Sequence, residues 1–530
     1  MNNGYSVISI IKKELFVVRF HMRNKMVLVY HKIRAHSVQN FISGILYQLI
    51  VAVSGFIMPR LIIANYGSVL NGLVSTVTQL VTYLAIVEMG LASASLVALY
   101  KPMATRDYIT ASRVVSAINS FYHRVALFFS VGTLVCGIIL PLVIQDDIPV
   151  TTIWLVVAAV SGVNLVTYIF LGKYRALLQS DNRLYVSNYV KCLSVVIQLC
   201  LSLYIIRLSW NIAFIKFTAI ITGMIEFFLL SYYCKRVYPE IKMNVNPQID
   251  AIRQRKDILI HQISALILNN TDVLLLTLFG STLALVSVYS VYNMVMMILF
   301  NVISSLMSSR SAVLAKLYVL GKIDELRTEM YRFERLYYFV VFSLYACMIV
   351  FVMPFVRLYT QGVTDINYDI PLIGALFPIL GICRVLRGCY AEITNAAGKF
   401  KETKIQSINS AIINISISLL LIWKYQIPGL LIGSIIAELY RTVHCMIFFY
   451  RQLFPFDWKS LVLRIIINII LIVLTYIIMK QWRDMSFTNY YSAFLIMALV
   501  SAVILLLFWM VNCIMDYLIK CLKGRKNTLS

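Results

Sequence analysis

The feature that most constrains this chain is a succession of long apolar segments along almost its whole length. A window of about 19 residues finds about fourteen of them. They lie near residues 40–63, 70–99, 125–144, 151–171, 185–206, 212–232, 258–279, 284–308, 336–355, 370–390, 403–423, 428–449, 461–479 and 490–515. A bilayer core offers no water to satisfy backbone polar groups, so segments of this length must be helices. The sequence therefore predicts an all-α polytopic membrane protein with about fourteen transmembrane helices.

Positive charge is distributed unevenly between the two sides of this predicted bundle. The chain carries 47 Lys and Arg against 23 Asp and Glu, a net charge of +24. With the amino terminus in the cytoplasm, about 39 of these cations fall in cytoplasmic segments and about six in external loops. We therefore expect both termini to be cytoplasmic and the basic side to face the anionic inner leaflet. The charge does not indicate nucleic-acid binding, because no groove-reading or base-stacking motif accompanies it.

The chain resembles itself at an offset of about 216 residues. Segment 99–107 resembles 314–324, and segment 174–183 resembles 390–399. Six spans in each copy give both copies the same orientation, related by an axis along the membrane normal. The predicted organisation is a basic amphipathic segment (1–37), an N-lobe (38–239), a C-lobe (240–457), two further helices (458–517) and a basic cytoplasmic tail (518–530).

Several classes of protein find no support in the sequence. No G-x-x-x-x-G-K-[ST] loop is present, and the six histidines are scattered without metal-ligand spacing. The ten cysteines lie mostly inside spans and do not suggest disulfides. The external loops are short, with Asp146 and Asp147 as their acidic pair near a span end. We predict no catalytic residue, metal or cofactor, and an integral glycosyltransferase or polymerase is the weaker alternative.

Charges within the spans are the candidate functional residues, because burying a charge in a bilayer is costly. Arg384 and Arg387 lie about two-thirds of the way through the tenth span. Helical spacing groups them on one stripe with Gly381, Gly388, Glu392 and Asn395. Such a stripe suits a water-filled cavity that accepts an anionic group, since arginine bonds two phosphate oxygens at once. Alternatively, Arg387 reaches the inner interface and Arg384 pairs with Glu392.

Other intramembrane charges extend the set of candidates. Lys216 and Glu226 share the sixth span about 15 Å apart, too far to pair directly, so each is expected to face a cavity. Lys191 in the fifth span is a similar case nearer the inside. Further candidates are Asp272, which shares a face with Gln262 and Asn269, and Glu88. Glu438 is another candidate and is expected to pair with Arg441 at i, i+3. Asp272 either binds a coupling cation or neutralises an arginine.

Short motifs in order along the chain complete the pattern. The first two spans read Met58-Pro59-Arg60-Leu61, Tyr66-Gly67, Asn71-Gly72-Leu73 and Glu88-Met89-Gly90-Leu91, and the seventh and eighth read Asn270-Thr271-Asp272 and Val288-Tyr289-Ser290-Val291-Tyr292. In these motifs, the spans and the repeat, the chain resembles the bacterial polysaccharide flippases. These form the lipid-linked oligosaccharide branch of the multidrug/oligosaccharidyl-lipid/polysaccharide (MOP) exporter superfamily.

The resemblance implies a function and a location. It implies that an undecaprenyl-pyrophosphate-linked sugar repeat unit is flipped across the cytoplasmic membrane of a bacterium, for O-antigen, capsule or exopolysaccharide synthesis. The residues expected to bind the substrate are Arg384, Arg387, Lys216, Lys191, Arg60, Asn269 and Asn270, and those expected to couple an ion are Asp272, Glu88 and Glu226. Expected partners are membrane lipids, the polysaccharide polymerase and glycosyltransferases. A cation-coupled drug exporter of the same superfamily is the alternative, although it would favour an acidic cavity.

Overall fold

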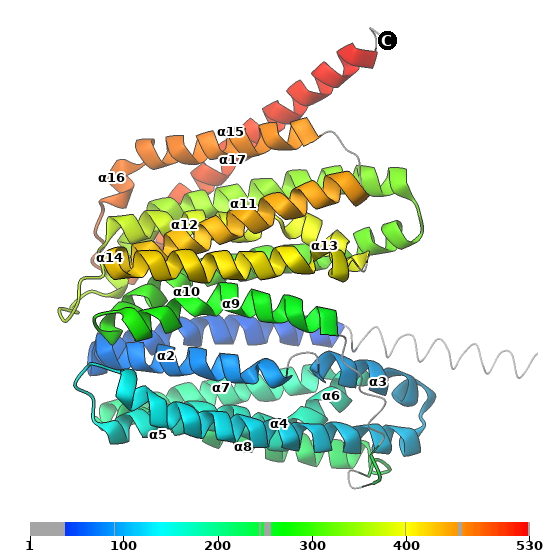
Figure 1. Cartoon of the computed structure of the whole chain (residues 1–530), viewed down its shortest axis with the longest axis vertical. Helices are drawn as coiled ribbons and strands as arrows, with labels where there is room; N and C mark the ends of the chain where they lie inside the picture. The colour runs from blue at the N-terminus through cyan, green and yellow to red at the C-terminus, as the bar shows by residue number, and fades with distance from the viewer. Residues whose placement is uncertain are drawn as a thin grey trace, which may run out of the picture.

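The computed structural model describes residues 36, 38–88, 91–242, 245–247, 256–397, 399–453 and 458–527. The predicted amphipathic segment 1–37 lies outside this part apart from His36. All regular structure in the described residues is helical (Figure 1). The prediction of an all-α polytopic membrane protein is confirmed.

Twelve helices among the described residues are long and apolar enough to cross a membrane. The first helix, Val38–Tyr66, is followed by α2 (Ser68–Leu84), η1 (Ala85–Glu88), α3 (Leu91–Thr105), α4 (Tyr108–Val143), α5 (Val150–Val166), η2 (Thr167–Leu171), α6 (Gly172–Ser180), α7 (Leu184–Arg207) and α8 (Ile212–Val237). The second half contains α9 (Lys256–Phe279), α10 (Leu283–Val319), α11 (Ile323–Tyr359), α12 (Pro371–Val385), α13 (Gly388–Ala396), α14 (Phe400–Phe448) and η4 (Phe449–Leu453). The chain ends with α15 (Trp458–Ile478), α16 (Lys480–Arg483) and α17 (Tyr490–Asn527).

Three of the predicted spans do not appear as separate helices among these twelve. The span predicted at 70–99 is interrupted, because α2 gives way to the tight turn η1 before α3 begins. The spans predicted at 403–423 and 428–449 form the two arms of α14, which reverses at Gln426 with a φ of 47°. Side chains then pair across the arms, as where Asn414 donates to Ser434 at 2.8 Å. Counting both arms and the interrupted span recovers about fourteen passes.

The helices form two lobes side by side, with a further pair against one of them (Figure 1). The N-lobe comprises the first helix to α8, and the C-lobe comprises α9 to η4. Across the boundary, α2 packs mainly on α10 and also touches α9. Outside the C-lobe, α15, α16 and α17 pack on α11. This arrangement agrees with the predicted pair of six-helix repeats plus two carboxy-terminal helices.

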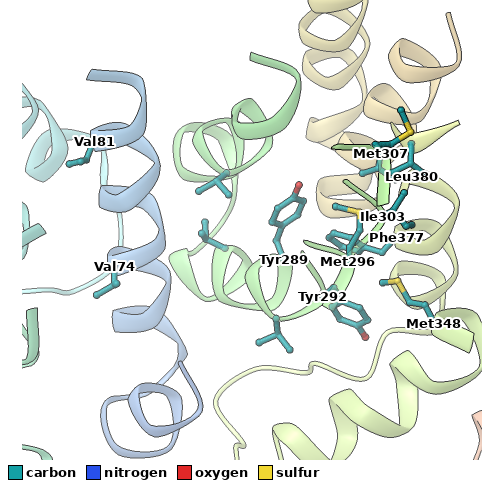
Figure 2. Packing of buried hydrophobic residues seen from close by; sticks show 14 of the residues in the cluster. Val74, Val81, Tyr289, Tyr292, Met296, Ile303, Met307, Met348, Phe377 and Leu380 are labelled. Carbon is teal, nitrogen blue, oxygen red and sulfur yellow. The ribbon is translucent and has the colours of Figure 1, made fainter. Parts of the chain in front are cut away.

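Aromatic residues fill the C-lobe beside the boundary. Tyr289 and Tyr292 of α10 are almost fully buried, and Tyr292 stacks on Phe377 of α12 with ring centroids 5.6 Å apart (Figure 2). The Tyr292 hydroxyl donates to the Tyr368 carbonyl at 2.7 Å, so its polar end is satisfied. On the other side, Val74 and Val81 of α2 point away from α10 into the N-lobe (Figure 2). Buried apolar side chains of both lobes thus belong to one cluster that extends to either side of the contact surface.

A buried polar contact holds the carboxy-terminal helices to one another and to α11. Arg464 of α15 pairs with Asp516 of α17 at 2.8 Å, and Asn468 and Asn512 exchange hydrogen bonds at 3.2 and 3.0 Å. Arg335 of α11 lies 3.4 Å from the other oxygen of Asp516. Polar groups in hydrocarbon are expensive unless paired, so these contacts fix the register of the pair.

Replacing Asp516 by Ala should destabilise the protein, because it leaves the buried Arg464 guanidinium without its carboxylate. Loss of one partner of a buried pair typically costs about 3–5 kcal/mol. Thermal unfolding of the purified protein in detergent measures the effect. The matched control is Glu329→Ala, which breaks the exposed 2.8 Å pair with Arg332 and should change stability by at most about 1 kcal/mol. Equal melting temperatures for the two variants would contradict the structural role of Asp516.

Candidate functional site

The two lobes are joined by a pair of crossed aspartate caps at one end of the bundle. Asp365, in the loop after α11, accepts hydrogen bonds from the Ser68 amide at 2.6 Å and the Ser68 hydroxyl at 2.8 Å, at the start of α2. Asp146, in the loop after α4, accepts from the Leu283 amide at 2.8 Å and from the Thr282 hydroxyl, at the start of α10. Each lobe therefore caps a helix of the other. We call this end, where both loops lie, the closed end, and the opposite end the basic end.

Helix physics explains why aspartates serve at these positions. The first amides of a helix have no partner within the helix, and the helix dipole favours a negative charge there. The side chain of Thr282 also caps α10 locally, whereas α2 is preceded by Gly67, which has no side chain to offer and a φ of +85°. The start of α2 therefore relies on Asp365 from the other lobe.

The caps surround a hydrogen-bonded chain that lies on the pseudo-symmetry axis. Asn71 of α2 donates to Ser287 of α10 at 2.7 Å, and the two residues are 216 positions apart. That separation matches the offset of the sequence repeat. Residues related by a twofold axis can touch only if they lie close to it, so the axis passes between Asn71 and Ser287. The Tyr368 hydroxyl connects Ser287 to Ser68, at 2.7 and 2.6 Å.

The contacts between α2 of the N-lobe and α9 and α10 of the C-lobe, which we call the seam, continue part of the way into the bundle. The Leu283 carbonyl approaches Gly72 so closely that a β-carbon on Gly72 would lie 1.9 Å from it. Deeper contacts join Thr76 to Thr277 at 2.7 Å and Tyr83 to Thr271 at 2.6 Å. Thr271 lies only about 12 Å from the end of α9. All hydrogen bonds between described residues of the two lobes fall between this point and the closed end.

Arg60 belongs to the same closed end. It lies on the first helix and donates to the Gln361 carbonyl of the C-lobe at 2.6 Å. Close by, the Tyr359 hydroxyl donates to the Phe56 carbonyl at 2.7 Å. Arg60 thus joins the lobes in this conformation, and its expected contact with a substrate stays a prediction.

A cavity of about 270 Å³ lies between the lobes next to the seam. The first helix, α2 and α8 line it from the N-lobe, and α9 and α10 from the C-lobe. Its polar lining residues are Asn71, Ser75, Thr78, Gln79, Ser290 and Asn293. Lys216 is the one charged residue in the lining, and no hydrogen bond joins it to another described residue. The cavity therefore combines apolar walls with hydrogen-bonding groups and a single basic side chain.

Arg384 and Arg387 lie inside the C-lobe, paired with one carboxylate. Arg384 Nε is 3.6 Å from Glu438 Oε1, and Arg387, in the turn between α12 and α13, donates to Glu438 Oε2. Arg384 is 4% exposed and Glu438 1% exposed, so this pairing is shielded from solvent. The expected local pair of Glu438 with Arg441 does not form, because Arg384 of α12 and Arg387 of the following turn reach Glu438 instead. A contact of either arginine with a substrate stays a prediction.

Asp272 extends this buried network. It accepts hydrogen bonds from Tyr289 at 2.8 Å and from Ser434 at 3.0 Å, and Arg384 lies within electrostatic reach of it. Of the two predicted roles, this geometry fits neutralisation of an arginine. Of the neighbouring asparagines, Asn270 bonds the Leu266 carbonyl of its own helix at 3.1 Å, and Asn269 is exposed. Among the described residues, no group of three or more His, Cys, Asp or Glu could hold a metal ion.

The N-lobe candidates lie on several helices. Glu226 of α8 pairs with Arg175 of α6 at 2.8 Å, and the Lys191 ammonium of α7 lies 5.5 Å from the ring centroid of Tyr47. Glu88, at the break between α2 and α3, accepts from the Tyr122 hydroxyl at 3.3 Å. The structure thus brings Lys191 and Glu226 into one cluster and leaves Lys216 in the cavity.

Three important residues were not among the sequence candidates. Arg175 lies just beyond a predicted span, among the cytoplasmic cations. Asp146 belongs to the external acidic pair, and no local sequence pattern distinguishes Asp365. A signal existed for these two, because the repeat offset places the counterpart of Asp146 within three residues of Asp365.

No family model matches the sequence, and no curated protein is similar to it in sequence. Solved structures of membrane transporters do resemble it. The lipid II flippase MurJ in an inward closed conformation is 14% identical with a TM-score of 0.58, over 90% of this chain and 98% of that one. A multidrug resistance MATE family transporter of the MOP superfamily, in an inward-facing conformation, is 13% identical with a TM-score of 0.53, over 76% of this chain and 93% of the other.

A mutant of the Vibrio cholerae MATE transporter VcmN gives 13% identity and a TM-score of 0.51, over 80% of this chain and 98% of that one. At such low identity the likeness concerns the fold. The chain has the fold of MOP superfamily transporters, built as a multi-pass integral membrane protein.

Proposed function

We propose that this protein flips a lipid-linked oligosaccharide with a pyrophosphate head group across the cytoplasmic membrane, by alternating access between its two lobes. The observation that carries the proposal is the cavity between the lobes, where Lys216 supplies the one charge of the lining. A positive, hydrogen-bonding cavity suits an anionic saccharide head group. It does not suit a cationic drug, for which a carboxylate would be needed.

The seam supports the alternating-access part of the proposal. Its hydrogen bonds all lie toward one end, so the lobes can separate there only if the two aspartate caps break. On the charge distribution, the closed end is the external side and the basic end is the cytoplasmic side. The structure then corresponds to a conformation closed to the outside. A pair of lobes that closes at one end or at the other is the arrangement that alternating access requires.

The first helix offers a surface for the lipid tail. Phe41, Ile45 and Leu49 recur every four residues in its half nearer the basic end, and each is about half exposed or more. Residues at this spacing form one apolar stripe. A polyprenyl chain can lie along such a stripe while the head group crosses between the lobes. The resemblance to the polysaccharide flippases, and the fold shared with a structure described as a lipid II flippase, point to the same substrate class.

Replacing Lys216 by Gln should impair flipping, because the cavity loses the cation that offsets the charge of the head group. We expect lipid-linked repeat units to accumulate in the inner leaflet at unchanged protein abundance, with flipping reduced roughly tenfold. Lys216→Arg should retain most of the flipping. Leaflet-resolved analysis of lipid-linked repeat units in cells measures the effect. Lys424→Gln, which removes an exposed cation, is the control.

Two outcomes would count against the proposal. Normal surface polysaccharide in the Lys216→Gln strain would remove Lys216 from the mechanism. A deletion strain that makes full surface polysaccharide but becomes sensitive to cationic drugs would replace the flippase by a drug exporter.

Replacing both Asp146 and Asp365 by Asn should open the closed end. Hydrogen bonds from amides to a charged carboxylate contribute about 1.5–3 kcal/mol each, more than those to a neutral amide. The outward-open population should therefore rise about tenfold or more. Labelling of a Ser75→Cys probe, in the cavity wall, by an external membrane-impermeant maleimide measures it in a cysteine-free background.

The adjacent Asp147 provides a matched control for this experiment. It is exposed, and no hydrogen bond or ion pair joins it to another described residue. Asp147→Asn should leave the labelling rate unchanged. If Asp146→Asn/Asp365→Asn labelled no faster than Asp147→Asn, the caps would not control the closed end.

A further inference from the structure

A cluster of charged side chains lies inside the N-lobe, separate from the inter-lobe cavity. Arg175 comes from α6, Lys191 from α7 and Glu226 from α8, and Tyr47 of the first helix lies against them. Arg175 donates to Glu226 Oε1 from Nη2 at 2.8 Å and from Nε at 3.1 Å. The Lys191 ammonium is 5.5 Å from the Tyr47 ring centroid and within electrostatic reach of both Arg175 and Glu226.

The charges of this cluster do not balance. Two cations share one carboxylate, and no hydrogen bond joins Lys191 to another described residue. Glu226 is 4% exposed, whereas the Arg175 side chain is 26% exposed and so remains accessible. An uncompensated cation at this depth is costly and usually marks the path of an anion. In the C-lobe, Arg384 and Arg387 likewise contact the single carboxylate of Glu438, but there a second carboxylate, Asp272, lies within electrostatic reach of Arg384.

The Arg175–Glu226 pair also leaves binding capacity unused. Nε and Nη2 of Arg175 both donate to the single oxygen Oε1 of Glu226. The bidentate pairing that a guanidinium prefers, with one nitrogen on each of two oxygens, is therefore not formed. A phosphate group presents several oxygens to the same fork and carries more charge than a carboxylate. A phosphate can therefore compete with Glu226 for Arg175 while Lys191 supplies the second cation.

The cluster lies nearer the basic end than the cavity does. Tyr47 precedes Met58 of the cavity wall by eleven residues on the first helix, about 16 Å toward the basic end. On α8, Glu226 likewise lies about 15 Å from Lys216. The first helix and α8 thus contribute residues to both the cluster and the cavity, and a head group moving from the basic end would reach the depth of the cluster first.

We propose that Arg175 and Lys191, beside Tyr47, form a capture site for the phosphate groups of the substrate, and that Glu226 is the carboxylate that the phosphate displaces from Arg175. The capture site rests on the proposed function and adds to it a place where the head group binds before it reaches Lys216. Glu226 takes Arg175 back when the head group moves on, so it favours release.

Binding of undecaprenyl pyrophosphate to the full-length protein in detergent tests this site. Lys191→Gln should weaken binding about tenfold, and Lys191→Arg should restore it. Glu226→Gln should tighten binding about tenfold, because the internal competitor loses its charge, and should slow flipping. A purely structural Glu226 would not give tighter binding. Lys424→Gln serves as the control for net charge.

Other outcomes would overturn the capture site. Lys191→Gln removes no hydrogen bond between described residues and should fold, so unchanged binding in this variant would overturn the site. Weaker binding in a folded Glu226→Gln variant would overturn it too. If these variants altered binding of inorganic pyrophosphate but not of undecaprenyl pyrophosphate, the site would serve a free anion instead of the lipid. If wild type bound the lipid and only Lys216→Gln weakened it, the capture site would fail while the proposed function stood. If wild type neither bound nor flipped it, the proposed function itself would fail.

Discussion

The capping of each lobe's helix by an aspartate of the other lobe is the contact on which the rest of this structure depends. A carboxylate satisfies helix amides only within hydrogen-bonding distance, and the interaction weakens steeply beyond it. Asp146 and Asp365 therefore hold only when the lobes meet at the closed end. The cavity beside Lys216 is shaped by the same contact, since α2 and α10 line it just below their capped ends. Breaking the caps would at once expose amides, separate the lobes and open the cavity.

The position of the symmetry axis explains why the two caps act together. The axis passes between Asn71 and Ser287, with one cap on either side of it. A rocking motion of one lobe on the other changes both caps in the same sense, because they are related by that axis. The Leu283 carbonyl lies directly against Gly72, so this contact between the lobes is lost as soon as they move apart. Packed interfaces of this kind have discrete arrangements, which suits a transporter with two states.

The sequence predicted the fold well and the pairing of charges poorly, for a physical reason. Hydropathy and loop charge report how each segment meets the bilayer, a property local to the segment, and the repeat added the relation between lobes. Pairing depends on which helices face one another. The i, i+3 rule predicts a pair of Glu438 with Arg441, but such a local pair is weak, and Glu438 instead contacts Arg384 of α12 and Arg387 of the following turn. A hydropathy window does not identify Arg175 as an intramembrane charge, because the predicted apolar span ends at residue 171.

A symmetric fold need not give a symmetric path for charge. In the C-lobe, Glu438 contacts both Arg384 and Arg387 and lies within electrostatic reach of Arg441, and Asp272 lies within electrostatic reach of Arg384. In the N-lobe, Arg175 and Lys191 share the single carboxylate of Glu226, and Lys216 stands alone in the cavity wall. On the proposed function, an anionic head group therefore gains most by keeping to the N-lobe side of the boundary. The C-lobe then contributes shape, the cap on α2 and the opposing wall, and the repeat has diverged in charge while it remains alike in backbone.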